Sequence, residues 1–196
     1  MSHDHEGSAV VSNRVKRLVA ELEARSILTE IELDETVEQF LLHSKPANAF
    51  GMIARAWVDP EYKSRLLADA SKAAEELGVD LSHWAPVKLR AVENTPQTHN
   101  VIVCTLCSCY PIALLGPSPK WYKSEAYRSR VVRDPRSVLA EFGVTLPEDK
   151  HITVWDSTSE IRYVVVPERP GDSDSATEAQ LASLITRNGL VGTALL

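Results

Sequence analysis

Cysteine is scarce in this sequence, and all of it lies in one place. The 196 residues contain three cysteines, all between Cys104 and Cys109. An odd number of thiols in one short stretch argues against a disulfide framework, because disulfide-stabilised domains carry paired cysteines spread along the chain. The absence of other cysteines therefore favours a metal or redox site in this stretch.

The sequence also lacks a long apolar run and a block of basic residues. No apolar segment approaches the roughly 20 residues of a membrane-spanning helix. The first ten residues, MSHDHEGSAV, are polar and acidic, unlike a signal peptide. The 21 Lys and Arg residues against 27 Asp and Glu give a net charge of -6, the wrong sign for neutralising phosphates. We expect a cytoplasmic protein whose partners include neither nucleic acid nor a membrane.

Helical patterns fill the first 78 residues. Apolar residues at helical spacing predict helices in residues 13–25, 34–44 and 47–59. A fourth predicted helix begins at Pro60 and ends at Gly78, since proline is typical of helix starts and glycine of helix ends.

The pattern changes after residue 80. KLRAVEN and HNVIVC, joined by TPQT, predict two strands, and the cysteines begin where the second strand ends. Further elements are predicted downstream: helices in residues 124–134 and 135–143, strands in 151–157 and 160–167, and a helix after a capping box of Thr177 and Gln180. Strands and helices mix without strict βαβ alternation, which favours an α+β fold over a doubly wound sheet.

Several kinds of site could explain the cysteines. Three core cysteines would fit poorly in a loop that contains Ser108 and Pro111. A structural zinc site and an iron-sulfur cluster each take four ligands. His99 could be the fourth, but it lies at the opposite end of the predicted strand, well away from Cys107. Both metal sites stay open but incomplete.

Backbone nitrogen atoms offer another donor set. In a tight Cys-Ser-Cys turn, the deprotonated amides of Ser108 and Cys109 can bind a metal in the plane of two thiolates, with Cys104 as a fifth donor. One coordination position stays open, as in catalytic rather than structural metal sites. Strong sulfur and amidate donors suit low-spin trivalent cobalt or iron. Accessible thiolates in such a loop can also be oxygenated to sulfenate and sulfinate.

The stretch VCTLCSCYP resembles the metal-binding motif of the nitrile hydratase α subunit. The resemblance continues through PKWYKSEAYRSRVVRDPRSVLAEFG, VWDSTSEIRYVVVPERP and LITRNGLVG, and it runs from about Arg55 to Gly192. The six-residue cysteine motif is highly specific for this family.

The resemblance implies a ligand set. Cys104, Cys107 and Cys109 would bind the metal through sulfur, and Ser108 and Cys109 through backbone nitrogen. Cys107 would be a sulfinate and Cys109 a sulfenate, and these two would be the catalytic residues. In this family a threonine after the first cysteine accompanies cobalt and a serine accompanies iron. Thr105 therefore indicates a non-corrin cobalt(III), with iron(III) as the alternative.

The resemblance also implies a reaction and partners. A nitrile would be hydrated to its amide at the metal, and one or two β-subunit chains would complete the active site. A metal-loading activator is a further expected partner. We expect an N-terminal helical arm, residues 1–58, that wraps the β subunit. A catalytic domain with α/β/β/α layers, residues 59–196, would follow.

Four further residues are candidates for the surroundings of the metal. Asp156 and Arg162 lie around the turn between two predicted strands, where they either support the site or belong to a solvated hairpin. Tyr110 either lines a pocket or fills the core, and Ile112 is a pocket candidate. Ile112 stands where cobalt-type relatives often carry tryptophan, so the pocket would be larger. This suggests a bulky or heteroaromatic nitrile, as in the toyocamycin-type enzymes.

Two other functions compete with this interpretation. The metal-bearing subunit of thiocyanate hydrolase resembles the same family and uses a similar motif. A non-catalytic metal-binding or redox-sensing module would use the same thiols without a reaction. Activity on thiocyanate would identify the first, and unoxidised cysteines with a freely exchanging metal would identify the second.

Overall fold

In the computed structural model, which describes residues 3–81, 87–107 and 109–196, two long helices make up the first of two units, Met1–Leu42. Helix α1 spans His3–Ala24 and α2 spans Glu30–Leu42. Helix α1 begins ten residues before the apolar pattern predicts, in the polar stretch. No residue of α2 is buried, and apolar side chains such as Val15, Leu18 and Phe40 are exposed.

The second unit, His43–Leu196, mixes helices and strands. Its helices are α3 (Pro46–Val58), α4 (Pro60–Ala68), α5 (Ala70–Glu76), α6 (Ile112–Leu115), α7 (Lys120–Lys123), α8 (Glu125–Arg130), α9 (Pro135–Glu141), α10 (Glu178–Leu184) and the 3-10 turn η1 (Gly189–Val191). The predicted capping box is confirmed, since Thr177 and Gln180 cap α10 reciprocally.

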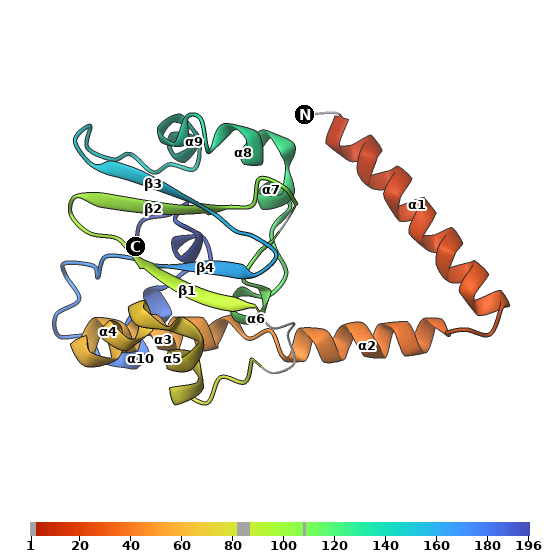
Figure 1. Cartoon of the computed structure of the whole chain (residues 1–196), viewed down its shortest axis with the longest axis horizontal. Coiled ribbons are helices and arrows are strands. Elements are labelled where there is room, and N and C mark those ends of the chain that lie inside the picture. The colour runs from red at the N-terminus through yellow and green to blue at the C-terminus, as the bar shows by residue number, and fades with distance from the viewer. Residues whose placement is uncertain (1–2, 82–86, 108) are drawn as a thin grey trace. The chain divides into compact units, whose positions relative to one another are not determined.

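Two small parallel sheets form the middle of this unit. Strand β1 (Lys88–Glu93) pairs with β4 (Ile161–Val166), and β2 (Thr98–Val103) pairs with β3 (His151–Asp156). Within this unit, α8 and α9 lie outside the β2–β3 sheet, and α3, α4, α5 and α10 lie outside the β1–β4 sheet (Figure 1). The mixed α and β fold and its layers are as predicted.

Two local predictions are corrected by the structure. The single helix predicted from Pro60 to Gly78 is wrong, because the chain breaks at Asp69. Its extended backbone ends α4, and its carboxylate accepts the N–H of Lys72 in the first turn of α5. The alternative of a hairpin between β3 and β4 is also wrong, because each strand pairs with a different, earlier strand.

The units divide between Leu42 and His43, whereas the sequence suggested a division after residue 58. Helix α3 accounts for the difference, because it packs against α4 and α10 and buries Met52 and Ile53 in the second unit. A functional arm of residues 1–58 stays a prediction. None of the helices in the described residues has the length and apolar character needed to cross a membrane.

A buried polar network and a close backbone contact fix β2. The Asn100 side chain donates to the Glu93 carbonyl and accepts from the Trp155 indole, at 2.7 and 2.8 Å. At the other end of the chain, Gly192 adopts a φ of +87° against this strand, where a Cβ would lie 1.9 Å from the Asn100 carbonyl oxygen. Only glycine fits there without moving the backbone.

We therefore expect Gly192→Ala to lower the free energy of unfolding by about 3 kcal/mol or more, from steric overlap and left-handed strain. Urea denaturation followed by circular dichroism measures this change. Gly51→Ala is the control, because Gly51 lies inside α3 with no atom within 4 Å of its added Cβ. It should stabilise the chain by about 0.5 kcal/mol. Equal stability of the two variants would contradict the assigned contact.

Candidate metal centre

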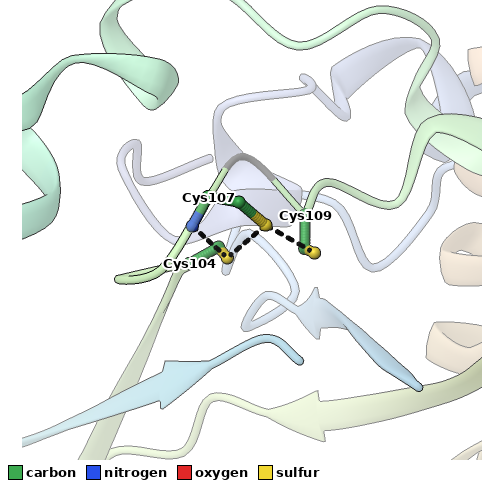
Figure 2. Close-up of side chains that lie close together, drawn as sticks. All are labelled: Cys104, Cys107 and Cys109. Carbon is green, nitrogen blue, oxygen red and sulfur yellow. Dashed lines mark hydrogen bonds between the residues drawn. The ribbon is translucent and has the colours of Figure 1, made fainter. Parts of the chain in front are cut away.

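The cysteine loop, residues 104–109, begins one residue after β2 ends, as the sequence predicts. Cys104 is buried, Cys109 is partly buried and Cys107 is exposed. Their three Sγ atoms lie within 4.8 Å of one another. Figure 2 shows the thiols turned toward one another, and the Cys107 N–H also points at the Cys104 sulfur, at 3.3 Å.

The sulfur spacing fits shared coordination of one ion. The Cys104 and Cys107 sulfurs are 3.3 Å apart, and the Cys107 and Cys109 sulfurs are 3.0 Å apart. Two sulfurs about 2.3 Å from one ion lie about 3.3 Å apart at a right angle and about 3.8 Å apart at the tetrahedral angle. The loop therefore presents neighbouring sulfurs at the spacing of an octahedral or square site.

Thr105 and Asp156 tie the loop to the other strand of its sheet. The Asp156 carboxylate accepts the Thr105 N–H at 2.9 Å and the Thr105 hydroxyl at 2.5 Å. The structure thus brings together two residues that the sequence singled out separately. The pairing register explains this, because Val103 lies opposite Asp156 and Thr105 follows two residues later.

Two side chains that donate to the loop carbonyls were not predicted. The Arg128 guanidinium donates from Nη1 to the carbonyls of Thr105 and Cys107, at 3.4 and 3.0 Å. The Tyr122 hydroxyl donates to the Cys109 carbonyl at 3.0 Å. Both residues lie in the α7–α8 segment, and no local sequence signal connects them to the loop.

A pocket of about 170 Å³ lies beside the third cysteine. Its lining is mostly aliphatic and includes the candidates Tyr110, Ile112 and Arg162, together with Leu81, Val87, Leu89, Pro111, Ala113 and Leu114. Burial, together with hydrogen bonding to Cys107, raises the pKa of the Cys109 thiol to about 12, and the charge of Arg162 opposes this shift. Arg162 therefore acts on Cys109 and lines the pocket at the same time.

Some predictions fall outside what the structure describes. Ser108, whose backbone nitrogen is a predicted ligand, lies outside the described residues, as do residues 82–86 of the stretch that differs from the family pattern. The assigned roles of the candidate residues, as distinct from their positions, stay predictions.

His99 is not part of the cysteine cluster. It is fully buried, its Nε2–H donates to the Gly192 carbonyl at 2.7 Å, and Nδ1 lies 3.3 Å from the Asn94 amide nitrogen. With Nδ1 as acceptor, this arrangement holds a neutral imidazole. Among the described residues, the one group of three or more potential metal-ligating side chains is formed by the cysteines.

The fold and the loop define a class of α and β protein in which three thiols gather at the end of a parallel strand, with the composition and spacing of a metal site. The family model for the nitrile hydratase alpha chain matches residues 9–194, and the chain belongs to this family.

Individual proteins that are similar to this chain include nitrile hydratase subunits and a thiocyanate hydrolase subunit. The alpha subunit of a low-molecular weight cobalt-containing nitrile hydratase from Rhodococcus rhodochrous is 46% identical over 93% of this chain and 87% of its own length. Thiocyanate hydrolase subunit gamma from Thiobacillus thioparus is 45% identical over 76% of this chain and 65% of its own. A double mutant of the Fe-type nitrile hydratase from Comamonas testosteroni Ni1 superposes with a TM-score of 0.87 at 40% identity, over 96% of this chain and 91% of that one.

Because burial lowers the pKa of His99 below the ordinary value of 6.5, the unfolded chain takes up this proton more readily than the folded one. We therefore expect the free energy of unfolding to fall as the pH drops below 6.5, by up to about 1.4 kcal/mol per pH unit. Urea titrations from pH 7.5 to 5 measure this. His99→Gln, which keeps a donor for Gly192, should show a shallower pH dependence, and an unchanged slope would contradict the assignment.

Proposed function

We propose that the chain is the catalytic α subunit of a cobalt-type nitrile hydratase. The observation that carries the proposal is the convergence of the three cysteine sulfurs, at the spacing of metal ligands, in a chain of the nitrile hydratase α family. The reaction is the addition of one water to a nitrile, which gives the corresponding amide.

The proposed ligands are the sulfurs of Cys104, Cys107 and Cys109 and the backbone nitrogens of Ser108 and Cys109. Bound there, a trivalent ion supplies a Lewis acid that polarises the nitrile. Thr105 and the cobalt-containing relative support non-corrin cobalt(III). The Fe-type structural relative supports iron(III) as the alternative.

The chain's own residues position the oxygen that adds to the nitrile carbon. We assign a sulfinate to Cys107 and a sulfenate to Cys109, which fits their greater exposure compared with Cys104. The oxygen that reaches the nitrile carbon comes from the Cys109 sulfenate or from a water that it activates. Thr105 and Asp156 hold the start of the loop, and Tyr110, Ile112 and Arg162 shape the pocket beside its end.

The proposed partner is a β subunit of one or two chains that completes the active site, together with a metal-loading activator. The arm contributes to this assembly. Support comes from the exposed apolar side chains of the first unit, which a partner surface would cover: Val10, Val11, Val15, Leu18, Ile27, Ile31, Val37 and Phe40. A cytoplasmic location stays a prediction from the sequence.

Thiocyanate hydrolase is the second candidate, since the T. thioparus gamma subunit is nearly as similar as the cobalt-containing relative. The mainly aliphatic pocket favours an uncharged nitrile over the thiocyanate anion. Arg162, the cation of this lining, is already bound through Nη1 to the carbonyls of Thr158 and Ile161.

Co-expression with the neighbouring subunit genes in cobalt-supplemented medium tests the proposal. We expect about one cobalt per chain by plasma mass spectrometry, added oxygens at Cys107 and Cys109 by peptide mass, and amide formation from nitriles. Cys104→Ser should abolish both cobalt binding and activity, because it removes the buried sulfur ligand. Zinc with three unmodified thiols would support a structural or sensing site, and turnover of thiocyanate alone would support the second candidate.

Ile112 tests the pocket and the proposed preference for bulky nitriles. An indole at this position would fill the pocket, so we expect Ile112→Trp to lower kcat/KM for an aromatic nitrile relative to acetonitrile by about tenfold or more. Steady-state rates on the two substrates give this ratio. Leu184→Trp is the control, because Leu184 is exposed on α10 and does not line the pocket. An unchanged ratio for Ile112→Trp would exclude the pocket from substrate binding.

A further inference from the structure

The cysteine loop is fixed by three side chains from different elements. Asp156 at the end of β3 accepts from Thr105, Tyr122 on α7 donates to the Cys109 carbonyl, and Arg128 on α8 donates to the Thr105 and Cys107 carbonyls. Of these three side chains, Arg128 alone is a cation and alone contacts the middle of the loop.

Arg128 differs from Asp156 and Tyr122 in carrying a positive charge. Metal-bound thiolates gather negative charge in the loop, and Asp156 adds another negative charge beside Thr105. Tyr122 is neutral. A guanidinium on the loop carbonyls therefore offsets charge that the other two contacts leave uncompensated. The positive charge of Arg162 acts on the other end of the loop, at the Cys109 sulfur.

The position of Arg128 also allows its guanidinium to restrain the shape of the cysteine loop. Its two carbonyl partners belong to residues on either side of Leu106, a side chain that is 89% exposed and gives the loop little packing. One nitrogen that bridges both carbonyls restrains the bend that brings Cys104 and Cys107 together. Helix α8 does not depend on this contact, because Ser124 caps it and Tyr127 donates to the Ile102 carbonyl at 2.6 Å.

We propose that Arg128 is a positioning residue that holds the cysteine loop in its metal-binding shape and balances the charge of the donor set. The inference rests on the proposed metal site. Its effect is on metal acquisition, since Arg128 donates to the loop carbonyls of Thr105 and Cys107 and not to the sulfurs of the three cysteines.

Cobalt loading of the co-expressed complex tests this role without relying on activity. We expect Arg128→Gln to need about tenfold more cobalt in the medium for half loading, as for other residues that orient metal ligands. The sulfur-to-cobalt charge-transfer absorption of the loaded fraction should also shift. Arg128→Lys keeps the charge and should recover part of the loading. Arg133→Gln is the matched control, because Arg133 is exposed and lines the same surface hollow as Arg128 and Thr105.

The outcomes separate this inference from the proposed function. Wild-type complex that takes up no cobalt overturns the metal site and this inference with it. A second outcome is a wild type that turns over nitriles and loads cobalt normally while Arg128→Gln gives the same loading curve and absorption. That result would overturn the role of Arg128 and leave the proposed function intact. If Arg128→Gln also lowers the unfolding temperature, Arg128→Lys distinguishes lost stability from lost charge as the cause of weaker loading. An Arg128→Lys variant that regains stability but not cobalt loading would overturn the charge argument.

Discussion

The parallel register between β2 and β3 is the constraint on which the candidate site depends. Val103 lies opposite Asp156, so the residue before the first cysteine sits beside the carboxylate that accepts from Thr105. Shifting the register by one residue would turn the Asp156 side chain to the other face of the sheet. The Asn100 network and the close approach of Gly192 hold β2 in place, so residues far from the cysteines help to fix the loop.

The contacts on the cysteine loop have two different effects: some hold its ends in place, and others supply positive charge. Hydrogen bonds from Thr105 and Tyr122 restrain its two ends, while Arg128 and Arg162 supply positive charge from α8 and β4. Once they ionise, three thiolates this close together repel one another, and contacts from the surrounding elements oppose that repulsion. Preorganisation by the surrounding elements is therefore part of the site.

Local patterns in the sequence predicted most of the longer helices, the strands and the position of the cysteine loop, because periodicity and spacing are local properties. They failed at Asp69, where a residue that can end one helix and cap the next lies inside an otherwise helical pattern. The local patterns also did not predict which strands pair with one another, because parallel strands are joined by long crossovers and their partners lie far apart in the sequence. For the same reason Arg128 and Tyr122 were missed: they contact the loop from 13 to 23 residues away, without a motif.

The unequal exposure of the three cysteines bears on their proposed chemistry. Cys104 is buried at the end of β2, where oxidants reach it least, whereas Cys107 is exposed and Cys109 borders the pocket through Tyr110. Oxygenation follows access and thiolate character. Burial and hydrogen bonds to Cys107 and Cys104 raise the pKa of the Cys109 thiol, whereas a thiol that coordinates a metal ion is deprotonated. A metal bound at the proposed site would therefore favour oxygenation of Cys109.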